Sequence, residues 1–111
     1  MLPRKYKLKK DNDFKKVFKQ GKNYQQEFIR LKILENNLKI SRFGLIVGLK
    51  ISKKAVERNK IKRRLEEVIR LKPLKPGFDV IILVSPEIVG KNYQIIEQSL
   101  TFLLKKAKIL E

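Results

Sequence analysis

The sequence predicts an α+β fold, a single-domain α/β sandwich whose elements follow the order α-β-β-α-β-α. Three observations carry this prediction: apolar and polar residues alternate over 28–33, an amphipathic helical pattern spans about 53–72, and an unbroken apolar run occupies 80–84. A chain of 111 residues has the length of one domain and can bury about two-thirds of its unfolded surface. We therefore expect one core and no interdomain linker within 1–111.

The N-terminal part is predicted to contain a basic arm and a short helix. Residues 1–10 are basic and lack apolar periodicity, so we expect a flexible arm. Phe14, Val17 and Phe18 then recur at helical spacing, which predicts a helix over about 11–20. From the pattern alone, Phe14 and Phe18 can be core residues or aromatic rings that stack on a ligand.

The first strand is predicted over 28–33. One of its faces is apolar, and the other carries Phe28, Arg30 and Lys32. An aromatic ring beside two cations suits single-stranded nucleic acid, but exposed cations also protect the edge of a sheet. Both interpretations stay open at this point.

The second strand, predicted over 43–50, has Gly44 and Gly48 on the same face. Two glycines leave a shallow floor that a neighbouring helix or a ligand can approach closely. A long helix follows over about 53–72, and Ser52 is its predicted cap.

A central strand and a last helix complete the expected fold. The segment 79–85 contains five consecutive apolar residues, which is typical of a strand covered on both faces. Asn92 can cap a helix whose apolar stripe extends from Tyr93 to Ala107. Strand, long helix and strand together predict a βαβ unit.

The long helix is predicted to have an apolar face and a cationic face. Successive helical residues are rotated by about 100°, so side chains three and four positions apart share a face. Arg58 projects between the two faces, where its stem can lie on the core and its guanidinium can reach the polar side. The apolar arc consists of Ile61, Leu65, Val68 and Ile69, and the polar arc of Asn59, Lys62, Arg63 and Arg70.

The charge balance indicates a polyanionic partner. Lysine and arginine total 28 against 11 acidic residues, a formal net charge of +17 that repels itself in the compact state. Nucleic acid is the predicted partner, although charge alone does not separate RNA, DNA and anionic lipid.

Several kinds of site are not expected. The chain has no histidine and no cysteine, so the commonest general base and the thiolate metal ligands are missing. Glu66 and Glu67 diverge by about 100° on a helix, and Asp11 and Asp13 are interpreted as helix caps, so we predict neither a catalytic residue nor a metal site. The glycines form no phosphate-binding loop, and no small-molecule substrate is expected.

No apolar run approaches the roughly 20 residues that span a bilayer, and the N-terminus lacks the apolar segment of a signal peptide. We therefore expect a cytoplasmic protein without a membrane partner.

The segment 55–63, AVERNKIKR, closely resembles the signature of the bacterial ribonuclease P protein subunit. The family hallmark is Arg-Asn, two residues, then Lys-Arg. The segment 13–21, DFKKVFKQG, is similar to the first-helix motif of that family, and the resemblance extends over about 8–104. Two departures are visible: no glycine shortly precedes the Ala-Val pair, and Glu66 stands where family members commonly have arginine.

The resemblance implies a ribosomal-protein-like sandwich with a left-handed βαβ crossover, against the usual handedness. It also implies that a large ribonuclease P RNA is the catalyst and uses Mg²⁺ to direct water at a phosphodiester. The protein would then bind that RNA and the 5′ leader of precursor tRNA without supplying a catalytic residue. The implied contacts to the catalytic RNA are Arg58, Asn59, Lys62 and Arg63, and the implied leader-binding residues are Phe14, Phe18, Phe28 and Arg30.

Two other functions fit a basic α/β protein. One is a ribosomal-type protein that binds structured RNA and has no role in cleavage. The other is a protein that inserts the basic helix into the major groove of duplex DNA.

Overall fold

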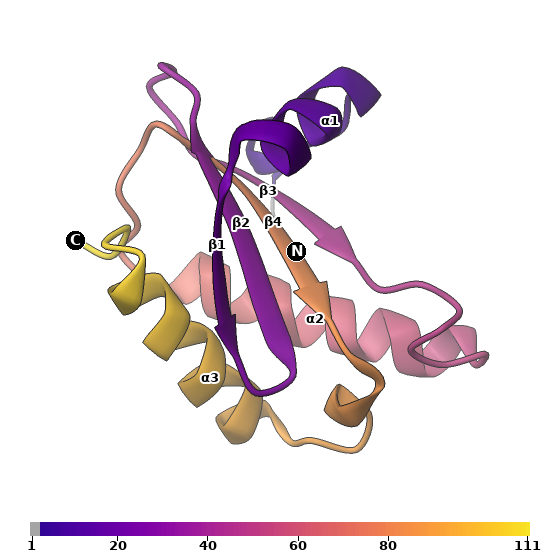
Figure 1. Ribbon diagram of the computed structural model, residues 1–111. Coiled ribbons are helices and arrows are strands. Elements are labelled where there is room, and N and C mark those ends of the chain that lie inside the picture. The colour runs from indigo at the N-terminus through magenta and orange to yellow at the C-terminus, as the bar shows by residue number, and fades with distance from the viewer. Residues whose placement is uncertain (1–2) are drawn as a thin grey trace.

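The structure is a computed structural model that describes residues 3–111, and its strands and α-helices are shown in Figure 1. In chain order the elements of this part are α1 (Asp11–Gln20), β1 (Lys22–Gln26), β2 (Ile29–Glu35), β3 (Arg42–Ile46), α2 (Ala55–Leu71), β4 (Phe78–Val84) and α3 (Tyr93–Lys106). Two short 3₁₀ helices, η1 (Arg4–Tyr6) and η2 (Pro86–Ile88), precede α1 and α3. The predicted elements are present in the predicted order, and one further strand follows α1.

The strands form one mixed sheet with the spatial order β1-β2-β4-β3. β2 pairs antiparallel with β1 and with β4, whereas β3 and β4 are parallel and are connected through α2. In Figure 1 both parallel strands point downward, β3 lies to the right of β4, and α2 passes behind the sheet. This arrangement is a left-handed βαβ crossover, opposite to the hand of nearly all such units and in agreement with the family resemblance.

The sheet is the middle layer of the sandwich. α2 and α3 cover one face and α1 lies across the other (Figure 1). Val80 and Ile82 belong to the main core on the side of α2 and α3, whereas Ile81 packs with Val17 of α1 and with Leu8. β4 is thus buried on both faces, as its unbroken apolar run predicts.

The strand β1 was not predicted, because only Tyr24 among its five residues is apolar and no alternation marks it. It is an edge strand that forms by backbone pairing with β2, from Lys22 opposite Ile33 to Gln26 opposite Ile29. Its polar composition is the usual protection of a sheet edge.

Part of the segment expected to be a flexible arm is attached to the sheet. The amide of Leu8 donates to the carbonyl of Phe43 at 2.9 Å, and Lys7 forms a parallel bridge with the same residue. The side chain of Leu8 is 5% exposed. Leu8 stands between two lysines and belongs to no helical or strand period, so the sequence pattern did not reveal this anchor. Met1 and Leu2, which belong to the predicted arm, lie outside the described residues.

The predicted helix caps have different outcomes. Asn92 is confirmed, because its side-chain oxygen accepts from the amide of Ile95 at 3.0 Å. Ser52 is not the cap of α2, which begins at Ala55 after Lys54. Its hydroxyl instead accepts from the Lys54 amide at 3.1 Å, because the chain makes one further turn before the helix starts.

Candidate nucleic-acid interface

The predicted two faces of α2 are confirmed. The residues of the apolar arc are each at most 4% exposed, whereas Asn59 and Arg63 are exposed and Lys62 is half-buried. Neither Lys62 nor Arg63 forms an ion pair with an acidic residue of the part that the structure describes. Asn59, Lys62 and Arg63 therefore present one amide and two cationic groups that are available for phosphates.

Other cations of α2 already have partners in the protein. Arg58 donates from Nη1 to the carbonyl of Ser52 at 2.8 Å, which ties the start of α2 to the preceding turn. Arg64 donates to the carbonyl of Lys91, and Arg70 forms an ion pair with Glu67. Arg58 is half-buried between the faces, as predicted. Only its Nη1 donates to Ser52, so its other guanidinium N–H groups can still donate to an RNA.

α1 carries Phe14 and Phe18 to the sheet face that α2 and α3 leave open. Phe18 is 39% exposed, and the ammonium of Lys32 lies 5.4 Å from the centre of its ring. The same ammonium is 3.4 Å from the carbonyl oxygen of Phe18. An exposed ring beside a cation offers a stacking surface and a phosphate contact together.

Phe14 reaches β3 because position 44 has no side chain. A Cβ at Gly44 would lie 2.6 Å from Cζ of Phe14, closer than two carbon atoms can approach. Of the two possibilities for the space above Gly44, a neighbouring helix or a ligand, the structure has the helix: the ring of Phe14 in α1 packs there. Gly48 does not share this role, because β3 ends at Ile46 and nothing lies within 4 Å of a Cβ built at Gly48.

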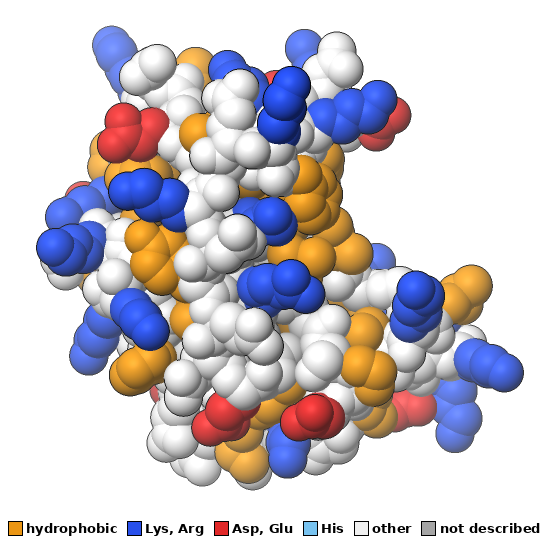
Figure 2. Space-filling view, viewed as in Figure 1, with side chains coloured by type: hydrophobic (Ala, Val, Ile, Leu, Met, Phe, Trp, Pro, Cys, Tyr) orange, Lys and Arg blue, Asp and Glu red, His pale blue; other side chains and the backbone are white. Residues whose placement is uncertain are grey.

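The floor next to α1 is a row of side chains across all four strands. The strand register places Gln25, Arg30, Leu83 and Ile46 side by side on this face. Arg30 is exposed and Ile46 is 36% exposed. Figure 2 shows this side of the molecule hollowed between α1 and the loop that leads into α2, with hydrophobic and basic side chains in the hollow.

Phe28 does not belong to this surface, which corrects its placement beside Arg30. The side chain is 3% exposed and packs in the main core. The chain turns at Glu27, whose φ is 53°, and β2 begins only at Ile29. The period-2 alternation therefore does not extend back to Phe28, and its ring is not available for stacking.

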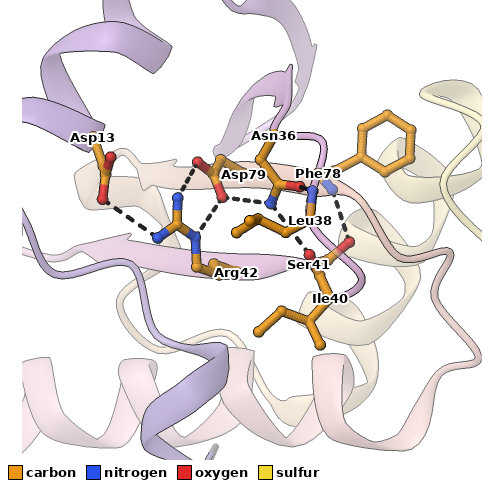
Figure 3. A network of polar contacts seen from close by, with 8 residues as sticks. All are labelled: Asp13, Asn36, Leu38, Ile40, Ser41, Arg42, Phe78 and Asp79. Atoms are coloured by element: carbon orange, nitrogen blue, oxygen red, sulfur yellow. Dashed lines mark hydrogen bonds and ion pairs between the residues drawn. The ribbon is translucent and has the colours of Figure 1, made fainter.

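A polar network fixes α1 against the sheet (Figure 3). Arg42 of β3 donates to both carboxylate oxygens of Asp79 in β4, at 2.8 and 2.7 Å, and lies 3.4 Å from the carboxylate of Asp13 in α1. Asn36 donates to the same Asp79 at 2.8 Å. The hydrogen bond to Asp79 is the main reason that the pKa of Arg42 is raised, with Asp13 contributing less.

The two surfaces implied by the resemblance meet at one cavity of about 210 Å³. Phe14 of α1 and Lys62 of α2 both line it, together with Glu66 and the basic segment around Leu8. The sequence did not predict that Lys7 and Lys9 line this cavity, because they belong to the segment expected to be a flexible arm. It also missed Leu83 and Ile46, whose apolar character predicted burial.

The whole-chain pattern matches the model of one family, described as Ribonuclease P, over residues 2–108. The chain belongs to the ribonuclease P protein family. The ribonuclease P protein component of Synechocystis sp. is 39% identical over 113 residues, which cover 99% of this chain and 91% of the relative. That of Clostridioides difficile is 34% identical, with 92% of this chain and 91% of the relative covered.

Solved structures agree with this assignment. The RNase P protein of Staphylococcus aureus superposes with a TM-score of 0.85 at 28% identity, covering 96% of this chain and 98% of that protein. The RNase P protein of Thermotoga maritima gives a TM-score of 0.82 at 29% identity, covering 90% and 96%. The left-handed sandwich described above is therefore the ribonuclease P protein fold.

Membership in the ribonuclease P family makes this chain the protein subunit of an endoribonuclease complex with an RNA partner. A ribosomal-type role without cleavage is not favoured. No helix within residues 3–111 has the length and apolarity needed to cross a membrane.

Proposed function

We propose that this subunit binds the catalytic RNA of ribonuclease P through α2 and the 5′ leader of precursor tRNA through the hollow beside α1. Arg58, Asn59, Lys62 and Arg63 are the proposed contacts to the catalytic RNA. Phe14, Phe18 and Arg30 are the proposed leader contacts, and Lys32 joins them. Such a role would place the protein in the cytoplasm with its tRNA substrate.

The observation that carries this proposal is the cavity shared by Phe14 and Lys62. A leader emerges from the site of cleavage, so leader contacts must lie next to the contacts with the catalytic RNA. The shared cavity gives the two surfaces this adjacency without any rearrangement of the fold.

The hollow suits a single strand of varied sequence. Phe18 offers an exposed ring that can stack on any base, and Lys32 and Arg30 lie close enough to neutralise neighbouring phosphates. Leu83 and Ile46 follow Arg30 across the next two strands and supply apolar contact there. The basic helix that could enter the major groove of a duplex is α2, and it covers the opposite face of the sheet.

The polypeptide is proposed to supply no catalytic residue. Within residues 3–111 no three acidic side chains are close enough to hold a metal ion, so the described residues do not fit a resident Mg²⁺. We assign Mg²⁺ to the RNA partner. The protein's contribution is a formal charge of +17 that screens repulsion between two RNAs, together with added leader contacts that raise substrate affinity.

Reconstitution tests this proposal. The purified protein is combined with a ribonuclease P RNA from one of the relatives, and cleavage of precursor tRNA is followed as Mg²⁺ is lowered. The protein should permit cleavage at Mg²⁺ concentrations at which the RNA alone is inactive, and the protein alone should cleave nothing. Equal activity with and without protein at every Mg²⁺ concentration would reject the proposal, and competition with duplex DNA at the same salt concentration would reveal a DNA-binding function.

A further inference from the structure

A second basic cavity lies beside the C-terminal end of α2. Its volume is about 510 Å³, which is within the range of small-ligand sites. Arg70 is seven residues from Arg63, the last residue of the family signature, so the two lie roughly 10 Å apart along α2 at 1.5 Å per helical residue. It shares one described lining residue, the buried Phe43, with the cavity between Phe14 and Lys62, and none of that cavity's cationic residues lines it.

The floor of this cavity is apolar and its rim is cationic. Phe43 and Ile69 form a floor that is 5% and 4% exposed, and the half-buried Tyr6 contributes an aromatic side chain. None of the described lining residues is acidic. The cationic lining residues are Lys39, Arg70, Lys72 and Lys75.

Two of these cations are not committed to partners. Arg70 pairs with Glu67, and Lys72 lies 2.7 Å from Glu97. Lys39 and Lys75 are exposed and form no ion pair with an acidic residue in the described part of the chain. Two uncompensated cations beside an apolar floor favour a ligand that is both anionic and partly apolar.

The walls are held in place by hydrogen bonds from inside the protein. The hydroxyl of Ser41 donates to the carbonyl of Lys75 at 2.6 Å and accepts from the amide of Phe78 at 3.1 Å. Lys75 in turn donates its amide to Ile109 at 2.8 Å. Segments from three parts of the chain are thereby fixed around the opening. Binding a ligand would therefore cost little further conformational entropy in these loops.

We propose that this cavity binds one unpaired nucleotide of an RNA, with its base on the apolar floor beside Tyr6 and its flanking phosphates at Lys39 and Lys75. An unpaired base is the part of an RNA that can enter a concave site, and stacking with cationic phosphate contacts is the usual mode of its recognition. The site rests on the RNA partner that the family implies and is independent of the contacts proposed for α2 and α1. The nucleotide belongs either to the ribonuclease P RNA or to precursor tRNA.

The first test uses adenosine 5′-monophosphate as the probe and amide NMR of the whole protein as the readout. Signals of Tyr6, Ser41 and Lys75 should shift and saturate, and ribose 5-phosphate should bind the same place more weakly. The double variant Lys39→Ala/Lys75→Ala should weaken the probe by about tenfold, as expected for lost charge-assisted contacts. Lys105→Ala removes an exposed cation of α3 that does not line the cavity. It should change the affinity for adenosine 5′-monophosphate less than twofold, because a single distant surface charge contributes little. Unsaturable shifts, or equal affinity for ribose 5-phosphate, overturn the proposal.

The second test assigns the nucleotide to its RNA. In the reconstituted enzyme, Lys39→Ala/Lys75→Ala lowers affinity for free ribonuclease P RNA if that RNA supplies the nucleotide, or lowers only the affinity for precursor tRNA if the substrate does. No change relative to Lys105→Ala in either measurement overturns the proposal. Lys62→Ala should leave binding of the mononucleotide intact, so failure of the α2 assignment and failure of this site are read separately.

Discussion

Arg42 and Asp79 form a two-point ion pair between the parallel strands β3 and β4, and the Asp79 side chain is only 8% exposed. The same guanidinium lies 3.4 Å from Asp13 at the start of α1. One arginine therefore connects the edge of the sheet to the helix that carries Phe14 and Phe18. This contact adds to the packing of the fully buried Val17 against Ile81, which also holds α1 on the sheet.

Arg42→Ala should destabilise the protein by about 3–5 kcal/mol, because it leaves the nearly buried Asp79 carboxylate without its cation. Asp13→Asn removes only the longer, more exposed contact and should cost less than about 1 kcal/mol. Urea unfolding of both variants measures the difference. Equal losses would mean that the ion pair within the sheet is not the stabilising part of the network.

Gly44→Ala should displace Phe14, since the new methyl group would overlap its ring. We expect a loss of about 1–3 kcal/mol from overpacking and a reduced preference for precursor over mature tRNA. Phe14→Leu added to Gly44→Ala should recover stability, because the smaller side chain leaves room for the methyl group. If the double variant is no more stable than Gly44→Ala alone, the destabilisation does not arise from overlap with Phe14.

Phe18→Ala and Phe28→Ala should have opposite profiles. Phe18 is 39% exposed, so its removal should leave stability nearly unchanged while weakening leader binding by about 1–3 kcal/mol, the worth of one stacked base. Phe28 is 3% exposed, and its removal should cost about 3–5 kcal/mol of stability. Thermal unfolding and precursor tRNA affinity, measured on both variants, separate the two roles.

Lys62→Ala should weaken binding to ribonuclease P RNA and reduce the slope of log affinity against log salt by about one. The reason is that one fewer cation displaces counterions from the phosphates. Lys105→Ala is the matched change on α3, and it should leave the slope unaltered. A slope unchanged by Lys62→Ala would remove this residue from the RNA interface.

Glu97 should make stability depend on acid. Hydrogen bonds from Lys72 and then Thr101 lower the pKa of Glu97 below its ordinary value of 4.5. A carboxyl with a lowered folded-state pKa stabilises the protein above its unfolded pKa and loses that contribution as pH falls through the folded one. Glu97→Gln should therefore lower the free energy of unfolding near neutral pH. The difference in stability between the original protein and the variant should shrink below pH 4.5, which unfolding at a series of pH values will measure.

The elements with strong periodicity were predictable. The two faces of α2, the buried strand β4 and the cap at Asn92 all follow from spacing, because helical and strand periods place like residues together wherever the core lies. The family signature in α2 is likewise readable without coordinates, since it is one contiguous segment. Composition alone ruled out thiolate and histidine chemistry.

Relations between distant segments were decided only by the tertiary structure. β1 exists because β2 offers it a pairing edge, Leu8 is held by Phe43, and Phe28 enters the core because the chain turns at Glu27. Each depends on backbone pairing with another segment or on a single backbone angle, and neither leaves a periodic pattern in the sequence. The sequence alone therefore determined the basic charge, the two faces of α2 and the family signature. Folding decided that Phe14 and Lys62 share a cavity and that Phe28 is buried, because those outcomes depend on how α1, the sheet and α2 pack.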